Sequence, residues 1–143
     1  MNRDQFTDLR DLPDKVIASD IEFLPDKAIS TTLSFDQVEV ENGLGYELVL
    51  NGSYIPNIPA LKFNFVVKGV GAICRIEING VVHKPIGRTH KHALIDENCP
   101  RKNLPHADAR PDLDLHTHTP RQIWETVCQE SGILHTGKFV EPK

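Results

Sequence analysis

Four of the seven histidines in this 143-residue chain form two His-x-His pairs, His90 with His92 and His116 with His118. On a strand, residues two apart point to the same side, about 6–7 Å apart. Two neutral imidazoles placed in this way can share a metal ion, and zinc is the default metal for imidazole ligands. The two pairs together offer four nitrogen ligands, and the carboxylate of Asp114 is expected to orient a ligating ring. One interpretation is therefore a zinc site that unites the two pairs.

The same histidines support a metal-free chemistry. One imidazole acting as base and another as acid can cleave RNA if a nearby cation stabilises the phosphorane. Arg88, Lys91 and Arg75 are the candidate cations. Each also has a simpler interpretation: Arg75 pairs with a glutamate across the sheet, Arg88 and Lys91 solubilise a strand edge, and histidines of a polar loop are simply hydrated. The candidate catalytic residues are His90, His92, His116, His118 and Arg88.

A longer pattern surrounds the first pair. The stretch from Arg75 through Glu77, Gly80, His83 and Pro85, followed by the His-x-His pair at 90–92, resembles a pattern of Arg-x-Asp, Gly, His, Pro and then His-x-His. That pattern is found in small uncharacterised bacterial and phage proteins and, more distantly, in the TumE family of toxin–antitoxin proteins. The resemblance covers roughly residues 60–133, with Glu77 in place of the usual Asp and without the usual Asn-Pro-Asp-Gly turn. It implies a small accessory protein of phages or mobile elements and, on the TumE side, a toxin that acts on RNA.

The elements that must position these residues are strands. Apolar residues alternate with polar ones over 46–51, 61–67 and 72–79, which is typical of half-buried strands in an antiparallel sheet. Turn residues separate the runs at Asn42-Gly43, Asn51-Gly52, Gly69–Gly71 and Asn79-Gly80, and the last of these is a type I′ hairpin signal. We expect four to six strands over residues 30–95.

A helix is predicted over residues 119–132. Thr119 is a natural N-cap, Pro120 suits the first helical position, Gln122 completes a capping box and Gly132 is the expected stop. Residues 97–118, rich in proline and histidine, lack periodicity and are predicted to form a long loop. Together these features predict an α+β domain spanning 1–143, in which the C-terminal helix packs on one face of the sheet.

Charge divides the chain unevenly. Residues 1–50 carry 4 Lys/Arg against 11 Asp/Glu, whereas residues 51–143 carry 12 against 9 and contain every histidine. Residues 1–28 are interpreted as an acidic N-terminal arm with a short helix or irregular structure. The chain lacks a signal-peptide pattern and has no run near the ~20 apolar residues of a membrane helix, so we expect a cytoplasmic protein. Three cysteines without a Cys-x-x-Cys pair argue against thiolate zinc or a disulfide framework.

Three functional hypotheses remain open on this basis. The first is an enzyme whose histidines act on RNA or another phosphate-bearing substrate. The second is a non-catalytic binding or inhibitor module for a host protein or nucleoprotein, with the acidic first third docking a basic partner. The third is a structural or regulatory zinc protein. A homodimer formed by edge pairing of the strand at Thr89–Ile95 would be compatible with any of them.

Overall fold

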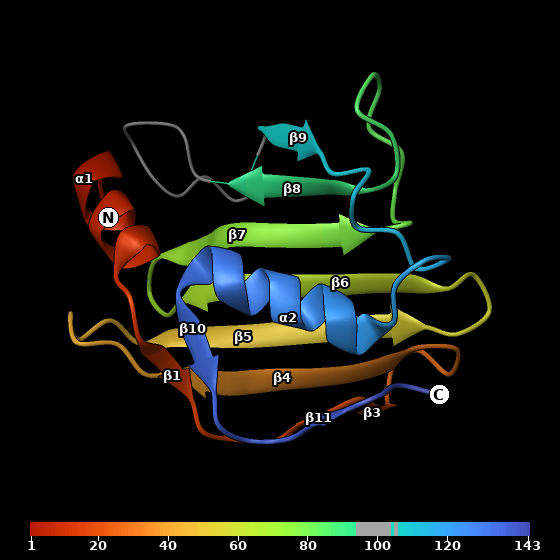
Figure 1. Cartoon of the computed structure of the whole chain (residues 1–143), viewed down its shortest axis with the longest axis horizontal. Helices are drawn as coiled ribbons and strands as arrows, with labels where there is room; N and C mark the ends of the chain where they lie inside the picture. The colour runs from red at the N-terminus through yellow and green to blue at the C-terminus, as the bar shows by residue number, and fades with distance from the viewer. Residues whose placement is uncertain (94–103, 105) are drawn as a thin grey trace.

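Alternating sequence builds one large antiparallel sheet. The computed structural model describes residues 1–93, 104 and 106–143. Its seven-stranded sheet has the order β3-β4-β5-β6-β7-β8-β9, and every neighbouring pair is antiparallel (Figure 1). The strands are β3 (Leu24–Pro25), β4 (Leu33–Val40), β5 (Leu48–Ile55), β6 (Ala60–Val67), β7 (Gly71–Ile78), β8 (His90–Ala93) and β9 (Ala107–Ala109). Five of them, β4 to β8, start within the predicted range, so the α+β class with an antiparallel sheet is confirmed.

The predicted turns have different outcomes. Asn42-Gly43 lies between β4 and β5 as predicted. The turn predicted at Asn51-Gly52 is wrong, because both residues pair with β6 inside β5, where Gly52 leaves room for the ring of Phe35.

Gly69 and Gly71, with φ of 76° and 127°, connect β6 to β7 as predicted. Asn79, with φ of 55°, does end β7, but it opens a longer loop of residues 79–89 instead of a tight hairpin. The tight turn fails because the Asn79 N–H donates to the Thr89 hydroxyl and the Asn79 amide donates to the Pro59 carbonyl. Through the hydrogen bond with Thr89, Asn79 holds the two ends of this loop together.

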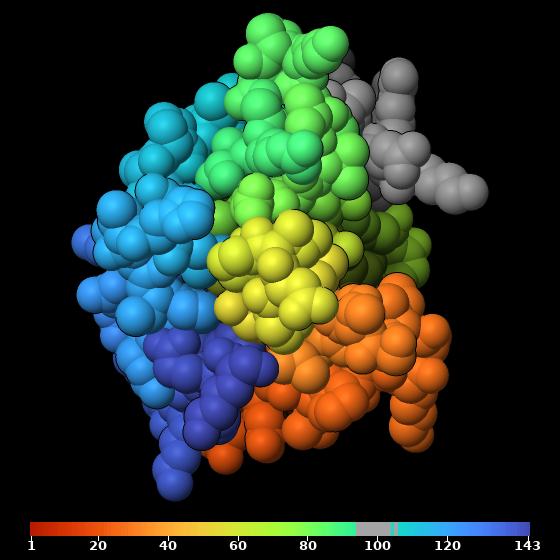
Figure 2. Space-filling model, turned by 90° about the vertical axis from the view of Figure 1, so that its right-hand side faces the viewer, coloured from red at the N-terminus to blue at the C-terminus, as the bar shows by residue number. Residues whose placement is uncertain are grey.

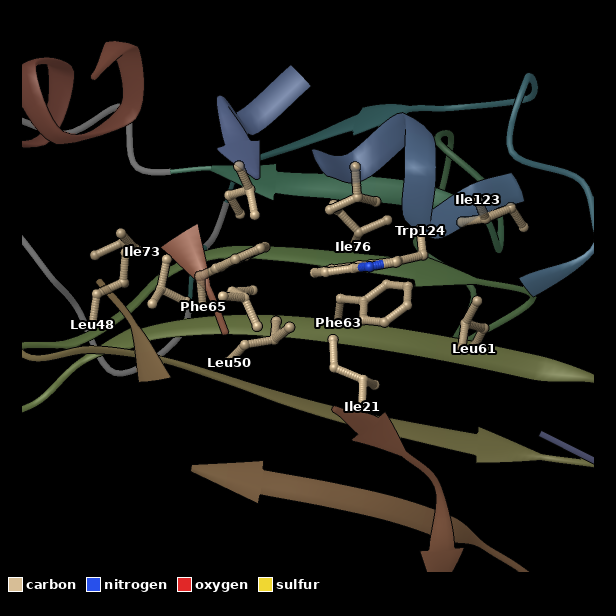
Figure 3. Close-up of a cluster of buried hydrophobic side chains, with 14 of the residues drawn as sticks. Ile21, Leu48, Leu50, Leu61, Phe63, Phe65, Ile73, Ile76, Ile123 and Trp124 are labelled. Atoms are coloured by element: carbon tan, nitrogen blue, oxygen red, sulfur yellow. The ribbon is translucent and has the colours of Figure 1, made fainter. Parts of the chain in front are cut away.

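The predicted helix is α2 (Pro120–Ser131), and its ends are those the sequence specifies. Thr119 and Gln122 form the reciprocal capping box, and Gly132 caps the C-terminus with φ of 62°. Trp124 packs against Phe63 of β6 with ring centroids 5.1 Å apart, as Figure 3 shows. The apolar stripe of α2 thus covers one face of the sheet, as predicted (Figure 1).

The chain ends are integrated into the core, contrary to the interpretation of residues 1–28 as an arm. Helix α1 (Arg3–Asp11) buries Phe6 and Leu9. Strand β1 (Lys15–Ile17) pairs in parallel with β10 (Ile133–His135), and β2 (Ile21–Glu22) pairs with β11 (Phe139–Val140). These strands are only two or three residues long, too short for their alternation to stand out in the sequence.

The stretch predicted to be a loop is partly a strand. Strand β9 lies within residues 97–118 and pairs with β8, while residues 97–103 and 105 of this stretch lie outside the described residues. Because β8 has β7 on one side and β9 on the other, its edges are already occupied. Over residues 89–93, the described part of the segment Thr89–Ile95, the strand is therefore not an edge through which a second copy would pair, and homodimer formation stays a prediction without this route. Neither helix of the described chain has the length and apolarity needed to cross a bilayer.

The two faces of the sheet differ in chemistry. Residues directly opposite one another on paired strands project to the same face. Ile76 and Ile78 of β7 are buried on the face that α2 covers, so Arg75 and Glu77, which alternate with them along the strand, project to the other face. The site described below lies on that other face.

Shortening Phe63 to alanine tests the packing of α2 on the sheet. Phe63 is fully buried, so Phe63→Ala is expected to lower the free energy of unfolding by about 3–5 kcal/mol through lost burial and a residual cavity. Chemical denaturation measures this loss. Glu125→Ala, on the exposed side of α2, is the control and is expected to change stability by less than about 0.5 kcal/mol. A loss below about 1 kcal/mol for Phe63→Ala would contradict the described core.

Candidate metal centre

Four side chains converge on the face of the sheet opposite α2. They are Glu77 of β7, His83 of the β7–β8 loop, and His90 and His92 of β8, and one ligand atom from each lies within 4.8 Å of the others. The three imidazole centroids are 4.6, 5.2 and 4.7 Å apart, and the rings are nearly perpendicular to one another. Among the described residues, this is the group of histidine, cysteine and carboxylate side chains that is compact enough to hold a metal ion. We call it the His₃Glu cluster.

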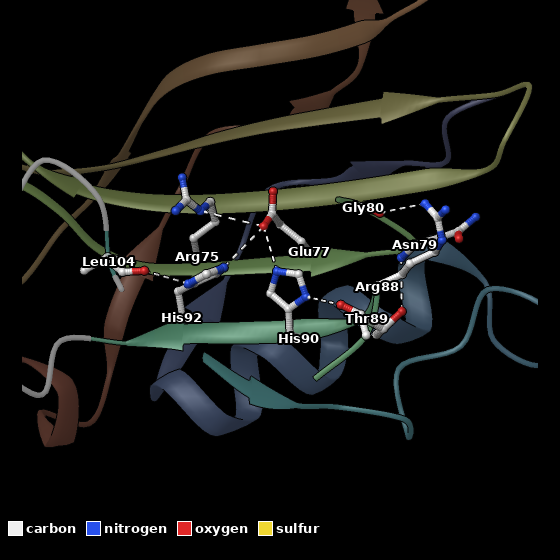
Figure 4. Close-up of polar contacts among 10 residues, drawn as sticks. Arg75, Glu77, Asn79, Gly80, Arg88, Thr89, His90, His92 and Leu104 are labelled. Atoms are coloured by element: carbon white, nitrogen blue, oxygen red, sulfur yellow. Dashed lines mark hydrogen bonds and ion pairs between the residues drawn. The ribbon is translucent and has the colours of Figure 1, made fainter. Parts of the chain in front are cut away.

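Strand register brings three of the four residues together. In the β7–β8 pair, His90 lies opposite Glu77 and His92 lies opposite Arg75. Opposite residues share a face, and their Cβ atoms are about 4.5–5.5 Å apart. Figure 4 shows both imidazoles reaching toward the Glu77 carboxylate, with α2 behind the sheet. Lys91, between the two histidines, points to the α2 side, where its Nζ lies 3.6 Å from Glu130.

The loop before β8 supplies the fourth residue. His83 and Gly87 exchange backbone hydrogen bonds of 3.0 and 2.7 Å, which form a small bridge within the loop. This bridge turns the chain back so that the His83 ring packs against the rings of His90 and His92. His83 is exposed, in contrast to the buried His90 and His92. The His₃Glu cluster is therefore open to solvent on the His83 side.

Hydrogen bonds to the backbone set the tautomers of the two buried histidines. His90 Nδ1 lies 3.2 Å from the Gly87 carbonyl oxygen, and His92 Nδ1 lies 2.8 Å from that of Leu104. A carbonyl oxygen only accepts, so each Nδ1 carries the proton and donates it. In a neutral ring this leaves the Nε2 lone pair free, which is the arrangement that orients metal-ligating histidines.

The free Nε2 atoms then face a carboxylate. Oε2 of Glu77 lies 2.9 Å from Nε2 of His90 and 3.4 Å from Nε2 of His92. The His92 Nε2 atom is buried and has no hydrogen-bond partner. Two imidazole lone pairs and a carboxylate oxygen repel one another unless a proton or a metal ion lies between them. The cluster therefore presents a cation-binding arrangement.

The ionisation of these groups suits a cation. Desolvation lowers the pKa of His92, and the charge of Arg75 adds to this effect. For Glu77 in the metal-free protein, burial acts to raise the pKa. A hydrogen bond through a proton between its Oε2 and His90 Nε2, together with the charge of Arg75, outweighs burial, so the pKa of Glu77 is lowered. Near neutral pH the cluster thus contains a carboxylate anion and a neutral His92, the protonation states that metal ligands require.

The structure separates the two His-x-His pairs. His116 and His118 are exposed in the turn before α2, where they line a shallow hollow with Tyr54 and Pro59. Tyr54 contacts the core ring of Phe23, so this hollow lies on the α2 side of the sheet. Figure 2 shows the segment before α2 (light blue) on one side of this end of the molecule and the β7–β8 loop (green) above it. The predicted four-histidine site is therefore not formed by the described residues, because the sheet lies between the pairs.

Two other candidate residues also lie outside the cluster. The Asp114 side chain accepts the backbone N–H of His116 within the turn before α2. The Arg88 guanidinium is exposed and donates to the Gly80 carbonyl. Both side chains therefore form hydrogen bonds with nearby backbone groups and do not reach the cluster.

Spacing within single strands did not identify Glu77 and His83 as site residues. Glu77 has a signal in the sequence, because it is an acidic residue between the core positions Ile76 and Ile78 of one strand. His83 had a signal only in the longer pattern from Arg75 to His92, all of whose histidines converge in the cluster together with Glu77. No family model, curated protein or solved structure matches this chain, so the resemblance stays a prediction and the site is argued from its geometry.

The lowered pKa of His92 predicts a pH dependence of stability in the metal-free protein. An unfolded His92 takes up a proton near pH 6.5, whereas the folded residue resists protonation to lower pH. The stability contributed by His92 is therefore complete above about pH 6.5 and is lost as the pH falls below that value. Glu77 acts in the same direction at lower pH, below about pH 4.5.

Thermal unfolding in the presence of chelator, from about pH 7.5 to about pH 5, measures this effect. His92→Asn keeps an amide donor for the Leu104 carbonyl but does not titrate, so its melting temperature is expected to fall less steeply than that of the wild type. His118→Asn, at an exposed histidine, is the control and is expected to follow the wild-type slope. Equal slopes for His92→Asn and the wild type would contradict the assignment.

Proposed function

We propose that this protein binds a divalent transition-metal ion through Glu77, His83, His90 and His92. The observation that carries the proposal is the convergence of three imidazoles and a carboxylate, with both buried imidazoles already oriented by backbone carbonyls. Imidazole and carboxylate are ligands that zinc takes readily, and zinc is the metal this set favours. The metal serves as a structural or regulatory centre that joins β7, β8 and the loop between them.

Ligand spacing supports zinc. Zinc bonds of about 2.0–2.2 Å in a tetrahedron place neighbouring ligand atoms about 3.3–3.5 Å apart. The two distances from Glu77 Oε2 to the histidine Nε2 atoms, 2.9 and 3.4 Å, are close to this spacing. The remaining separations reach at most 4.8 Å, so a small inward movement of the exposed His83 completes the tetrahedron.

Metal-free cleavage of RNA by the same histidines has weaker support. His90 and His92 are 0% and 4% exposed, and their Nε2 atoms face Glu77. A phosphodiester of a large nucleic acid has no access to both atoms, whereas a metal ion can enter past His83. His116 and His118, the other candidate acid–base pair, lie on the opposite face of the sheet.

Removing one exposed ligand tests the proposal with little risk to the fold. Protein purified without a histidine tag is expected to gain one zinc ion in native mass spectrometry and to lose it to chelator. His83→Ala is expected to weaken zinc binding at least tenfold in a calorimetric titration, because a ligand is lost from a four-ligand site. Glu77→Gln, which keeps the shape but not the charge, is expected to weaken it as well.

His118→Ala is the matched control for His83→Ala, since both histidines are exposed and lie outside helices and strands. Its zinc affinity is expected to equal that of the wild type. An equal loss in His118→Ala and His83→Ala would show that the second pair shares the metal, against the geometry described above. A wild-type protein that binds no metal would overturn the proposal and favour the alternatives, a metal-free enzyme or a non-catalytic binding module.

A further inference from the structure

We propose that the metal centre holds a phosphate group between the metal and the side chain of Arg75. This inference rests on the proposed metal site and names the chemical class of its ligand. Its starting point is a set of buried polar atoms without hydrogen-bond partners. Among the described side chains these atoms are Asn64 Oδ1, Arg75 Nε and His92 Nε2.

All three atoms belong to one row across the sheet. Asn64 of β6 lies opposite Arg75 of β7, and Arg75 lies opposite His92 of β8. Residues in such a row share a face and are neighbours, so the three unsatisfied atoms line one continuous strip that ends at the His₃Glu cluster. A buried polar group without a partner costs about 1–3 kcal/mol, and three in one row indicate a polar ligand that satisfies them together.

Arg75 is the cationic member of this strip. Its Nε lies 4.0 Å from Oε2 of Glu77, too far for a hydrogen bond. That same Oε2 is already the close neighbour of His90 and His92. Once a metal takes this oxygen, Arg75 has donors but no acceptor in the described part of the chain. Its side chain is 27% exposed, so a small ligand from solvent can reach it.

Charge favours an anion at this position. The single carboxylate of Glu77 offsets only part of the combined positive charge of a divalent ion and Arg75. In a half-buried site the remaining charge is poorly screened, so an anion that contacts both cations is stabilised. Zinc accepts a fifth ligand, and the exposed His83 is the protein ligand that gives way most easily.

The number of partners selects phosphate over a carboxylate. The metal, the Arg75 guanidinium and the Asn64 amide each need an oxygen, and a carboxylate has only two. A phosphate group has enough oxygens, and guanidinium binds two of them in a planar, bidentate fashion. The Asn64 amide can turn over to present its NH₂ group to the remaining phosphate oxygen, since the two orientations fill the same space.

Cobalt(II) in place of zinc makes the inference measurable, because its visible spectrum reports on the ligands of the metal. Inorganic phosphate is titrated into the cobalt-loaded protein at constant ionic strength, with chloride as the balancing anion. The wild type is expected to show a saturable spectral change. Arg75→Gln is expected to weaken phosphate binding at least tenfold, because charge-assisted hydrogen bonds are lost. Cobalt affinity is expected to stay equal or to rise, since a positive charge near the metal is removed.

Two further variants make the experiment specific. Arg88→Gln removes an exposed arginine of the neighbouring loop and is expected to bind phosphate like the wild type. Asn64→Asp keeps the side-chain shape but places a carboxylate opposite Arg75, where it pairs with the guanidinium and excludes phosphate. It is expected to lose phosphate binding even if Arg75→Gln does not fold.

The outcomes separate this inference from the metal site itself. Cobalt binding with no phosphate effect, or with equal phosphate affinity in the wild type and Asn64→Asp, would overturn the inference and leave the metal site intact. Acetate binding as tightly as phosphate, with the same dependence on Asn64, would also overturn it in favour of a carboxylate ligand. If cobalt does not bind to the wild type at all, both the proposed function and this inference fall together.

Discussion

The sheet face opposite α2 is organised around one ionised carboxylate, that of Glu77, which has few neighbouring groups that can neutralise its charge. Glu77 is 16% exposed, and its nearest neighbours are two imidazole nitrogens whose rings already donate their Nδ1 protons elsewhere. A half-buried charge must be paired, and the nearest permanent cation, Arg75, stays 4.0 Å away. The carboxylate and the lone pairs around it therefore favour the binding of a cation. A metal ion can bind the carboxylate and both imidazoles at once, whereas a single proton can lie between the carboxylate and only one of the two imidazoles at a time.

The rest of the fold fixes the positions of Glu77, His90 and His92. The opposite face of the sheet is the hydrophobic core, where Phe63 and Trp124 are packed. Strand β8 cannot shift in register without moving Lys91 away from Glu130 of α2 or breaking its pairing with β9. Because the side-chain period of a strand is two, such a shift by one residue would carry His90 and His92 to the α2 side. Packing on one face thereby fixes the geometry of the charged groups on the other.

The sequence predicted what local rules control and missed what depends on distant pairing. Strand alternation, the capping box of Thr119 and the stop at Gly132 are local signals, and the structure follows them. The spacing of His90 and His92 likewise predicts that they share a side. The register of β8 with β7 decides which face the two histidines occupy and which residues lie opposite them. Spacing within one strand contains no information on this register. The short helix expected in the N-terminal segment is present, but the segment is not an arm. Ile17 and Ile21 become core residues only because their strands pair with strands from the opposite end of the chain, which local patterns do not reveal.

The two His-x-His pairs show why spacing alone is a weak predictor of metal binding. The pairs have the same residues at the same interval, yet only one has its rings desolvated and its Nδ1 atoms tied to carbonyls. His116 and His118 are exposed, and Nδ1 of His118 lies 2.9 Å from the hydroxyl of its neighbour Thr117. An exposed pair must lose side-chain entropy and ordered water to bind an ion, whereas His90 and His92 have met most of that cost during folding. Preorganisation by the backbone, which is a property of the fold, is thus what distinguishes the proposed metal ligands His90 and His92 from the hydrated histidines of this chain.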